Sequence, residues 1–240
     1  MKVILIGADG FVGSSLIRFF KTTPNDLSVY TIGRSFFGAS SLTNSADIRK
    51  VFDYILNISE IDNQPTICIN LLSASNVDFC EKNPPVSEFV NYTFPKELYA
   101  RLMELSNIRI VSFSSNAVYC GTKPAYGEKS EFSPVNYYGQ HKALLDTFIR
   151  QDLASVIIIR PTTLFGAPME GNRSNPVHDL INKARAGDQV KLVTDLLVNF
   201  GYVNDLCKAI GRLIADGDQQ GEYNFGGPKT FSRYSLGLLI

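Results

Sequence analysis

Residues 2–20 read KVILIGADGFVGSSLIRFF, a sequence that predicts a strand, a glycine-rich turn and a helix. The apolar run at 3–6 suits a strand buried on both faces, and apolar residues then recur at helical spacing. Gly7, Gly10 and Gly13 stand between the two elements in a GxxGxxG spacing. Glycines let the backbone approach an anion, and the N–H groups and dipole of a helix start favour its charge. The stretch therefore indicates dinucleotide binding, with an ordinary strand-to-helix turn as the alternative.

Strands and helices continue to alternate along the chain. Apolar runs predict further strands at 28–32, 66–72, 108–113 and 155–159. Residues 36–44 are predicted to form a loop with at most one short strand. Amphipathic patterns predict further helices at 46–58, 84–106, 137–150, 177–186 and 203–215. Pro95 interrupts the longest of these helices and is expected to kink or split it. This rhythm predicts an α/β fold with a Rossmann-type doubly wound parallel sheet, covered by helices on both faces.

The expected domain boundary follows the last predicted strand. Residues 1–160 form the expected NADP-binding Rossmann domain, and residues 161–240 form a small substrate-binding lobe interwoven with it. Residues 166–176 are rich in Gly, Pro and Asn and predict a loop that borders the ligand site. The chain ends in the apolar run 234–240, so a truncated C terminus or a reduced lobe is expected.

Composition argues against several classes of partner. The 23 basic and 23 acidic residues cancel, which leaves no overall field for a nucleic acid or an anionic membrane. No apolar run approaches the roughly 20 residues that span a bilayer. Four cysteines without a CxxC spacing, and no signal peptide, predict reduced thiols in a cytoplasmic protein. His141 and His178 have no partner at metal-ligand spacing, so no metal site is expected.

Arg34 follows the second predicted strand, where a dinucleotide-binding fold faces the adenosine ribose. An acidic residue at this position hydrogen-bonds a 2′-hydroxyl, whereas an arginine accommodates a 2′-phosphate. No Asp or Glu lies between Asp26 and Asp47. The sequence therefore predicts NADP(H) rather than NAD(H), with a solvated loop arginine as the alternative.

Tyr138 and Lys142 are four residues apart in a predicted helix, which places both side chains on one face. A neighbouring ammonium favours the phenolate and is expected to lower the pKa of Tyr138, so the pair suits alcohol–ketone interconversion. Tyr137 stands one residue too early and is expected to face elsewhere. Ser115 follows the strand predicted at 108–113 and can hydrogen-bond a substrate carbonyl. A turn or helix-capping role is the alternative for Ser115.

Taken in order, these motifs resemble the extended branch of the short-chain dehydrogenase/reductase superfamily. The resemblance rests on the GxxGxxG turn, the run SSNAVY at 114–119 and the spacing of Tyr138 and Lys142. The segment VDFCEKNP at 77–84, followed by VN at 90–91, is similar to the VDxCExxP…VN segment of the dTDP-4-dehydrorhamnose reductase group. That group also includes the NADP-binding regulatory subunit of methionine adenosyltransferase.

The resemblance implies a role for each residue that matches a family motif. It implies that Ser115 orients the substrate carbonyl, Tyr138 donates the proton and Lys142 supports it. Contacts with NADP(H) are implied for the glycine turn, the ends of several strands and the catalytic pair: Gly7, Gly10, Phe11, Val12, Gly13, Arg34, Leu72, Ser73, Ala74, Asn91, Tyr138, Lys142 and Pro161.

Departures from the family pattern reduce the number of reactions expected of this protein. Asn-Ala at 116–117 stands where sugar dehydratases carry Asp-Glu, so dehydration is not expected. Leu-Leu at 71–72 and Ala74 replace small residues and a tyrosine of the reductase pocket, so the sequence does not identify the sugar. The first interpretation is an NADPH-dependent reductase of a nucleotide-linked 4-keto-6-deoxy sugar. The alternatives are an NAD(P)-dependent nucleotide-sugar 4-epimerase and a non-catalytic NADP-binding regulatory subunit; by analogy, a homodimer is expected.

Overall fold

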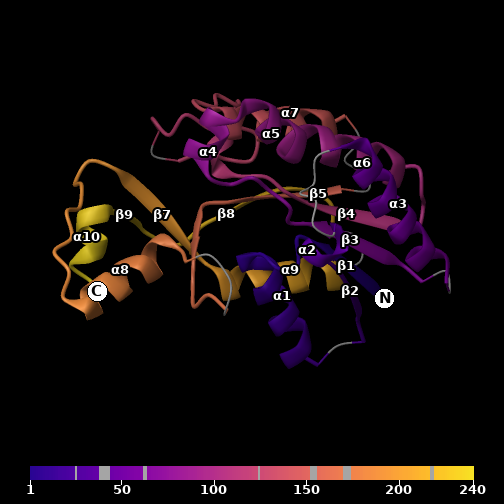
Figure 1. Ribbon diagram of the computed structural model, residues 1–240, viewed down its shortest axis with the longest axis horizontal. Coiled ribbons are helices and arrows are strands. Elements are labelled where there is room, and N and C mark those ends of the chain that lie inside the picture. Colours follow the sequence, from indigo (N-terminus) through magenta and orange to yellow (C-terminus); the bar gives the residue numbers. More distant parts are fainter. Residues whose placement is uncertain are drawn as a thin grey trace.

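The computed structural model describes residues 1–24, 26–37, 44–61, 64–123, 125–151, 156–169, 174–216 and 219–240. A six-stranded sheet crosses the middle of the molecule, with helices on both faces (Figure 1). Its strands are β1 (Lys2–Ile6), β2 (Ser28–Ile32), β3 (Thr66–Asn70), β4 (Ile108–Phe113), β5 (Val156–Pro161) and β8 (Gly221–Phe225). They lie in the order β2-β1-β3-β4-β5-β8, and every neighbouring pair is parallel. This order confirms the predicted Rossmann-type doubly wound sheet.

Two groups of helices cover the faces of this sheet. Above it in Figure 1 lie α3 (Ser45–Glu60), α6 (Phe94–Leu102) and α7 (Tyr137–Ile149); below it lie α1 (Phe11–Thr22) and α9 (Val203–Ala215). Because side chains alternate along a strand, β1 contributes to both layers. Ile4 and Ile6 pack with the upper helices, and Val3 and Leu5 pack with the lower ones. Burial on both faces is the reason that this strand reads as a continuous apolar run.

Helical structure continues past Pro95, but its hydrogen-bonding pattern changes just before that residue. After α4 (Val77–Lys82), it consists of α5 (Pro84–Glu88), a π-helical turn (Phe89–Thr93) and α6. Pro95 stands in the first turn of α6, where its missing N–H is tolerated. The interruption expected at Pro95 is thus a π-helical turn, which carries the fully buried side chain of Asn91.

A smaller three-stranded sheet lies in the C-terminal lobe, at the left of Figure 1. It contains β6 (Thr163–Phe165), β7 (Leu197–Tyr202) and β9 (Thr230–Ser232), and the lobe also holds α8 (Pro176–Ala186) and α10 (Arg233–Gly237). The pairing of β7 is parallel with β6 and antiparallel with β9. Between β7 and β9 the chain returns to the large sheet through α9 and β8. The division of the chain at residue 160 stays a prediction.

Several short elements differ from the sequence-based prediction. The sequence predicts no strand after residue 159, whereas the structure contains β6, β7, β8 and β9. Most residues of these strands are half-buried or exposed, so they lack the continuous apolar runs of the central strands. A short helix, α2 (Arg34–Phe37), overlaps the start of the loop predicted at 36–44. Residues 38–43 of that loop lie outside the described residues, as do 155 and 170–173 of two other predicted segments.

Candidate active site

The turn between β1 and α1 requires glycine at two positions. Gly7 has a φ of +82°, and a Cβ there would lie 2.9 Å from the backbone nitrogen of Leu72. A Cβ on Gly13 would lie 2.5 Å from the carbonyl oxygen of Gly7. The first glycine therefore lets the turn approach the end of β3, and the second lets α1 pack against the turn.

The start of α1 is open to an anion. Gly10 is the N-cap residue, so no side chain caps the N–H groups of the first turn. Phe11 and Val12 are the first two helical residues, and no acidic side chain stands in this turn. Free N–H groups and the positive end of the helix dipole suit a pyrophosphate. The residues here fit a nicotinamide dinucleotide, although this turn does not distinguish NADP(H) from NAD(H).

The segment after β3 is held by the buried amide of Asn91. Its Oδ1 accepts hydrogen bonds from the Ser73 hydroxyl at 2.9 Å and from the Ala74 N–H at 3.1 Å. Its Nδ2 donates to the Ala74 carbonyl at 3.1 Å. The Leu72 N–H donates to Oδ1 of Asn70 at 3.1 Å. The structure thus brings four predicted cofactor residues together, with Asn91 positioning Ser73 and Ala74, and Asn70 positioning Leu72.

Tyr138 and Lys142 lie on α7, and both side chains are buried. Oδ1 of Asn136 caps this helix by accepting the Gly139 N–H at 2.8 Å. A Cβ on Gly139 would overlap the carbonyl oxygen of Ala117. Glycine at this position therefore lets α7 contact the turn that follows β4, which brings Tyr138 toward that turn.

Ser115 stands in that turn and has two roles in the geometry. Its Oγ accepts the Ala117 N–H at 3.1 Å and so caps the short 3₁₀ helix Asn116–Val118. It also lies close enough to Tyr138 for a hydrogen bond that lowers the pKa of the phenol. Ser115 therefore caps the 3₁₀ helix and is also close enough to Tyr138 to contact a substrate bound there.

The pKa of Tyr138 is shifted upward, whereas the sequence predicts a downward shift. Burial raises the pKa of Tyr138, and hydrogen bonds with Ser73 and Ser115 only partly offset this. The expected lowering by Lys142 is therefore wrong for this structure. Nζ of Lys142 donates to the Phe113 carbonyl at 2.8 Å, and burial lowers the pKa of this ammonium to about 8. At neutral pH the phenol keeps its proton, as a proton donor requires.

A buried ionic network, which the sequence analysis missed, lies next to the tyrosine–lysine pair. Asp146 follows Lys142 by one helical turn, and its Oδ2 accepts from Arg160 at 2.7 Å and from the Ser114 hydroxyl at 2.8 Å. Arg160 also pairs with Glu222 at 2.6 Å. Asp146 partly opposes the effect of burial on the pKa of Lys142. The spacing of Asp146 was the available signal, because it continues the face of Tyr138 and Lys142.

The predicted site residues lie along one edge of the large sheet. The glycine turn follows β1, Arg34 follows β2, residues 72–74 follow β3, Ser115 follows β4 and Pro161 ends β5. Pro161 is half-buried, and Arg34 is exposed at the start of α2. Ligands of doubly wound folds bind at the carboxyl ends of the strands. The roles of these residues toward a ligand stay predictions.

Neither histidine is a predicted site residue, but His141 is connected to Asn91 through the Ser87 hydroxyl, which accepts from Nδ2 of Asn91 at 3.3 Å. His141 is buried and hydrogen-bonded through Nδ1 to the Ser87 hydroxyl at 2.9 Å, and the exposed Nδ1 of His178 lies 2.9 Å from the Ser174 hydroxyl. Within the described ranges, no three His, Cys, Asp or Glu side chains form a group that could hold a metal ion. In the same part of the chain, no helix combines the length and apolar character needed to cross a membrane.

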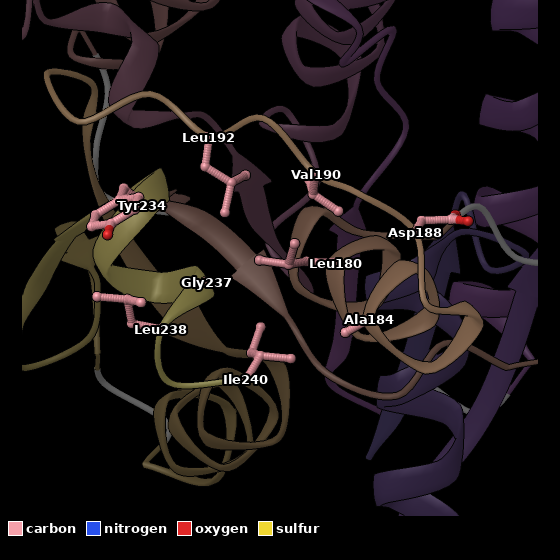
Figure 2. Close-up of a pocket in the computed structure, with 9 residues that line it drawn as sticks. All are labelled: Leu180, Ala184, Asp188, Val190, Leu192, Tyr234, Gly237, Leu238 and Ile240. Atoms are coloured by element: carbon pink, nitrogen blue, oxygen red, sulfur yellow. The ribbon is translucent and has the colours of Figure 1, made fainter.

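A separate apolar pocket of about 330 Å³ lies in the C-terminal lobe (Figure 2). It is lined mainly by aliphatic side chains: Leu180, Ala184, Asp188, Val190, Leu192, Tyr234, Gly237, Leu238 and Ile240. None of the predicted site residues is among them. The lining contains no cationic side chain that could pair with a phosphate, so this pocket does not suit a nucleotide.

The close approach at Gly139 leads to a prediction. Gly139→Ala is expected to lower the free energy of unfolding by about 1–3 kcal/mol, because the added methyl group forces α7 away from the Ala117 carbonyl. Urea unfolding followed by circular dichroism measures this. Gly127→Ala is the matched control, since a Cβ there meets nothing within 4 Å, and it should change stability by less than about 0.5 kcal/mol. Equal stability of the two variants would contradict the described contact.

The fold and the tyrosine–lysine pair define a protein of the extended short-chain dehydrogenase/reductase class. A family model described as the RmlD substrate binding domain matches residues 1–240. The chain therefore belongs to the RmlD substrate binding domain family.

Curated relatives and a solved structure agree with this assignment. The chain is 27% identical over 201 residues to the probable low-salt glycan biosynthesis reductase Agl14 of Haloferax volcanii, a match covering 81% of the chain and 64% of the relative. It is 27% identical over 218 residues to the spore coat polysaccharide biosynthesis protein SpsK of Bacillus subtilis, covering 89% of the chain and 70% of the relative. The chain thus spans about two thirds of the length of these relatives. The dTDP-4-dehydrorhamnose reductase of Bacillus anthracis, solved with NADP, has the same fold, with a TM-score of 0.84 at 23% identity, covering 99% of this chain and 79% of that one.

Proposed function

We propose that this protein is an oxidoreductase that uses NADPH to reduce the ketone of a nucleotide-linked 4-keto-6-deoxy sugar. The observation that carries the proposal is the position of Tyr138. Its buried hydroxyl lies within hydrogen-bonding reach of Ser73 and Ser115, at the carboxyl edge of a sheet whose first turn is open to a pyrophosphate. The family membership and the reductase among the relatives support this reading.

The residues of the chain divide the chemistry between them. NADPH, when bound, supplies a hydride to the carbonyl carbon. The Ser115 hydroxyl hydrogen-bonds the carbonyl oxygen and polarises the C=O bond. Tyr138 gives its phenolic proton to that oxygen, so that the ketone becomes an alcohol and the tyrosine becomes a phenolate. The Lys142 ammonium, present at neutral pH because the pKa is about 8, stabilises the phenolate until solvent returns the proton.

Two features support the finer parts of the proposal. Arg34 at the end of β2 favours NADP(H), because a guanidinium accommodates a 2′-phosphate. Asn-Ala at 116–117 lacks the acid and base of a dehydratase, so reduction is favoured over loss of water. We assign the sugar to the side of the site that faces residues 161–240, and we propose a homodimer by analogy with the family.

The test is consumption of NADPH across a panel of nucleotide-linked 4-keto sugars, measured on the purified protein by cofactor absorbance. We expect stoichiometric oxidation of NADPH with at least one member of the panel and none without a sugar. Interconversion of two 4-epimers without net consumption of NADPH would replace the proposal with an epimerase. Cofactor binding without turnover of any sugar would replace it with a regulatory subunit.

A further inference from the structure

Asp9 lies between Gly7 and Gly10, yet its carboxylate reaches the end of β2. Oδ2 of Asp9 accepts the backbone N–H of Arg34 at 2.6 Å. A Cβ on Gly33 would lie 2.6 Å from Cγ of Asp9, so the glycine leaves room for this carboxylate. The glycine turn therefore places a negative charge beside the residue that follows β2.

The segment that contains β2 has no acidic residue between Asp26 and Asp47. The tertiary structure supplies the carboxylate from 25 residues upstream of Arg34. At the end of β2, a carboxylate accepts a hydrogen bond from a ribose 2′-hydroxyl and repels a 2′-phosphate. Asp9 is exposed, so it is accessible to a ribose at this edge.

Arg34 favours the opposite ligand from the same place. Its backbone is fixed by Asp9, and its side chain is exposed at the first position of α2. A guanidinium attracts the 2′-phosphate that the carboxylate repels. Two determinants of opposite sign therefore stand side by side at the adenosine end of the proposed cofactor site.

We infer that Asp9 is a specificity-determining residue for the cofactor, which weakens binding of a 2′-phosphate and favours a free 2′-hydroxyl. This inference rests on the cofactor site of the proposed function. It means that the preference for NADP(H) is weaker than Arg34 alone would produce, so NADH is also bound. The Asp9 carboxylate carries one negative charge and a 2′-phosphate carries about two. At an exposed site, repulsion between them over a few ångströms corresponds to about a tenfold loss of affinity for the 2′-phosphate.

The test measures the adenosine end alone, without turnover. Isothermal titration calorimetry gives the Kd of AMP and of adenosine 2′,5′-bisphosphate for the wild type and for Asp9→Asn. The asparagine keeps an oxygen that can accept the Arg34 N–H, but it removes the charge. We expect the ratio of the two affinities to move about tenfold toward the bisphosphate. A purely structural role would change the melting temperature and both affinities together.

Two further variants complete the experiment. Glu104→Gln also removes an exposed charge, but Glu104 lies between α6 and β4, at the opposite edge of the sheet. The ratio of the affinities for the two ligands should therefore be the same in this variant as in the wild type. Arg34→Ala should move the ratio toward AMP. The inference is overturned if both ligands bind and Asp9→Asn leaves their ratio unchanged. Binding of neither ligand to the wild type would overturn the cofactor site, and with it the proposed function.

Discussion

Replacing Tyr138 with phenylalanine is expected to lower kcat about a thousandfold. The substitution removes the phenolic proton, which is the group that Tyr138 donates in the proposed reaction. A positioned acid contributes about 10²–10⁴-fold to the rate of such a step. The ring itself stays in a buried place that phenylalanine also fills. Steady-state rates with NADPH and the sugar identified by the panel measure kcat, and calorimetry measures the cofactor Kd, which should change less than about threefold.

The neighbouring Tyr137 provides the control. It is 40% exposed and stacks on His141 with ring centroids 6.1 Å apart, which agrees with the expectation that it faces elsewhere. Tyr137→Phe should leave kcat within about twofold of the wild type. A Tyr138→Phe variant with full turnover would exclude the tyrosine as the proton donor. A variant unchanged in everything except binding of a partner protein would support the regulatory subunit instead.

Replacing Arg160 with methionine is expected to lower the free energy of unfolding by about 3–5 kcal/mol. Arg160 is 1% exposed and pairs with two carboxylates, so the substitution leaves the buried Asp146 without its ion-pair partner and leaves Glu222 paired with Arg150. A buried carboxylate that loses its partner costs far more stability than a broken surface pair does. Guanidinium chloride unfolding at pH 7 measures the change.

Lys129 offers a matched control, because it reaches the same carboxylate from the surface. Its Nζ lies 3.6 Å from Glu222, but its side chain is 84% exposed. Lys129→Met should therefore change the free energy of unfolding by less than about 1 kcal/mol. An Arg160→Met variant as stable as Lys129→Met would show that the network does not stabilise the fold.

The pH dependence of the same measurement identifies the group involved. Hydrogen bonds from Arg150 and Arg160 lower the pKa of Glu222 to about 2, against the effect of burial. A carboxyl whose folded pKa is below its unfolded pKa stabilises the fold above the unfolded value, and this contribution disappears as the pH falls toward the folded value. In the wild type the loss should extend from about pH 4.5 down to about pH 2. In Arg160→Met the pKa of Glu222 in the folded protein is higher, so the loss should be smaller and should finish at a higher pH, while its start near pH 4.5 stays the same.

The sequence by itself determined the features that depend on neighbours along the chain. The buried run at 3–6, the glycine spacing and the placement of Tyr138 and Lys142 on one helix are periodic or local patterns, and the structure shows them as predicted. Alternation of strands and helices was enough to identify the doubly wound sheet, because right-handed crossovers leave few other arrangements for such a chain.

Only the tertiary structure decided which distant residues meet. Asp9 reaches the end of β2 because β1 and β2 are paired. Arg160 joins Asp146 to Glu222 because β5 pairs with β8, which carries Glu222, and lies within reach of α7, which carries Asp146. The raised pKa of Tyr138 has the same origin, since burial is produced by elements far apart in the sequence. Local periodicity records which side of an element is buried, whereas strand order and packing determine what each side chain meets there.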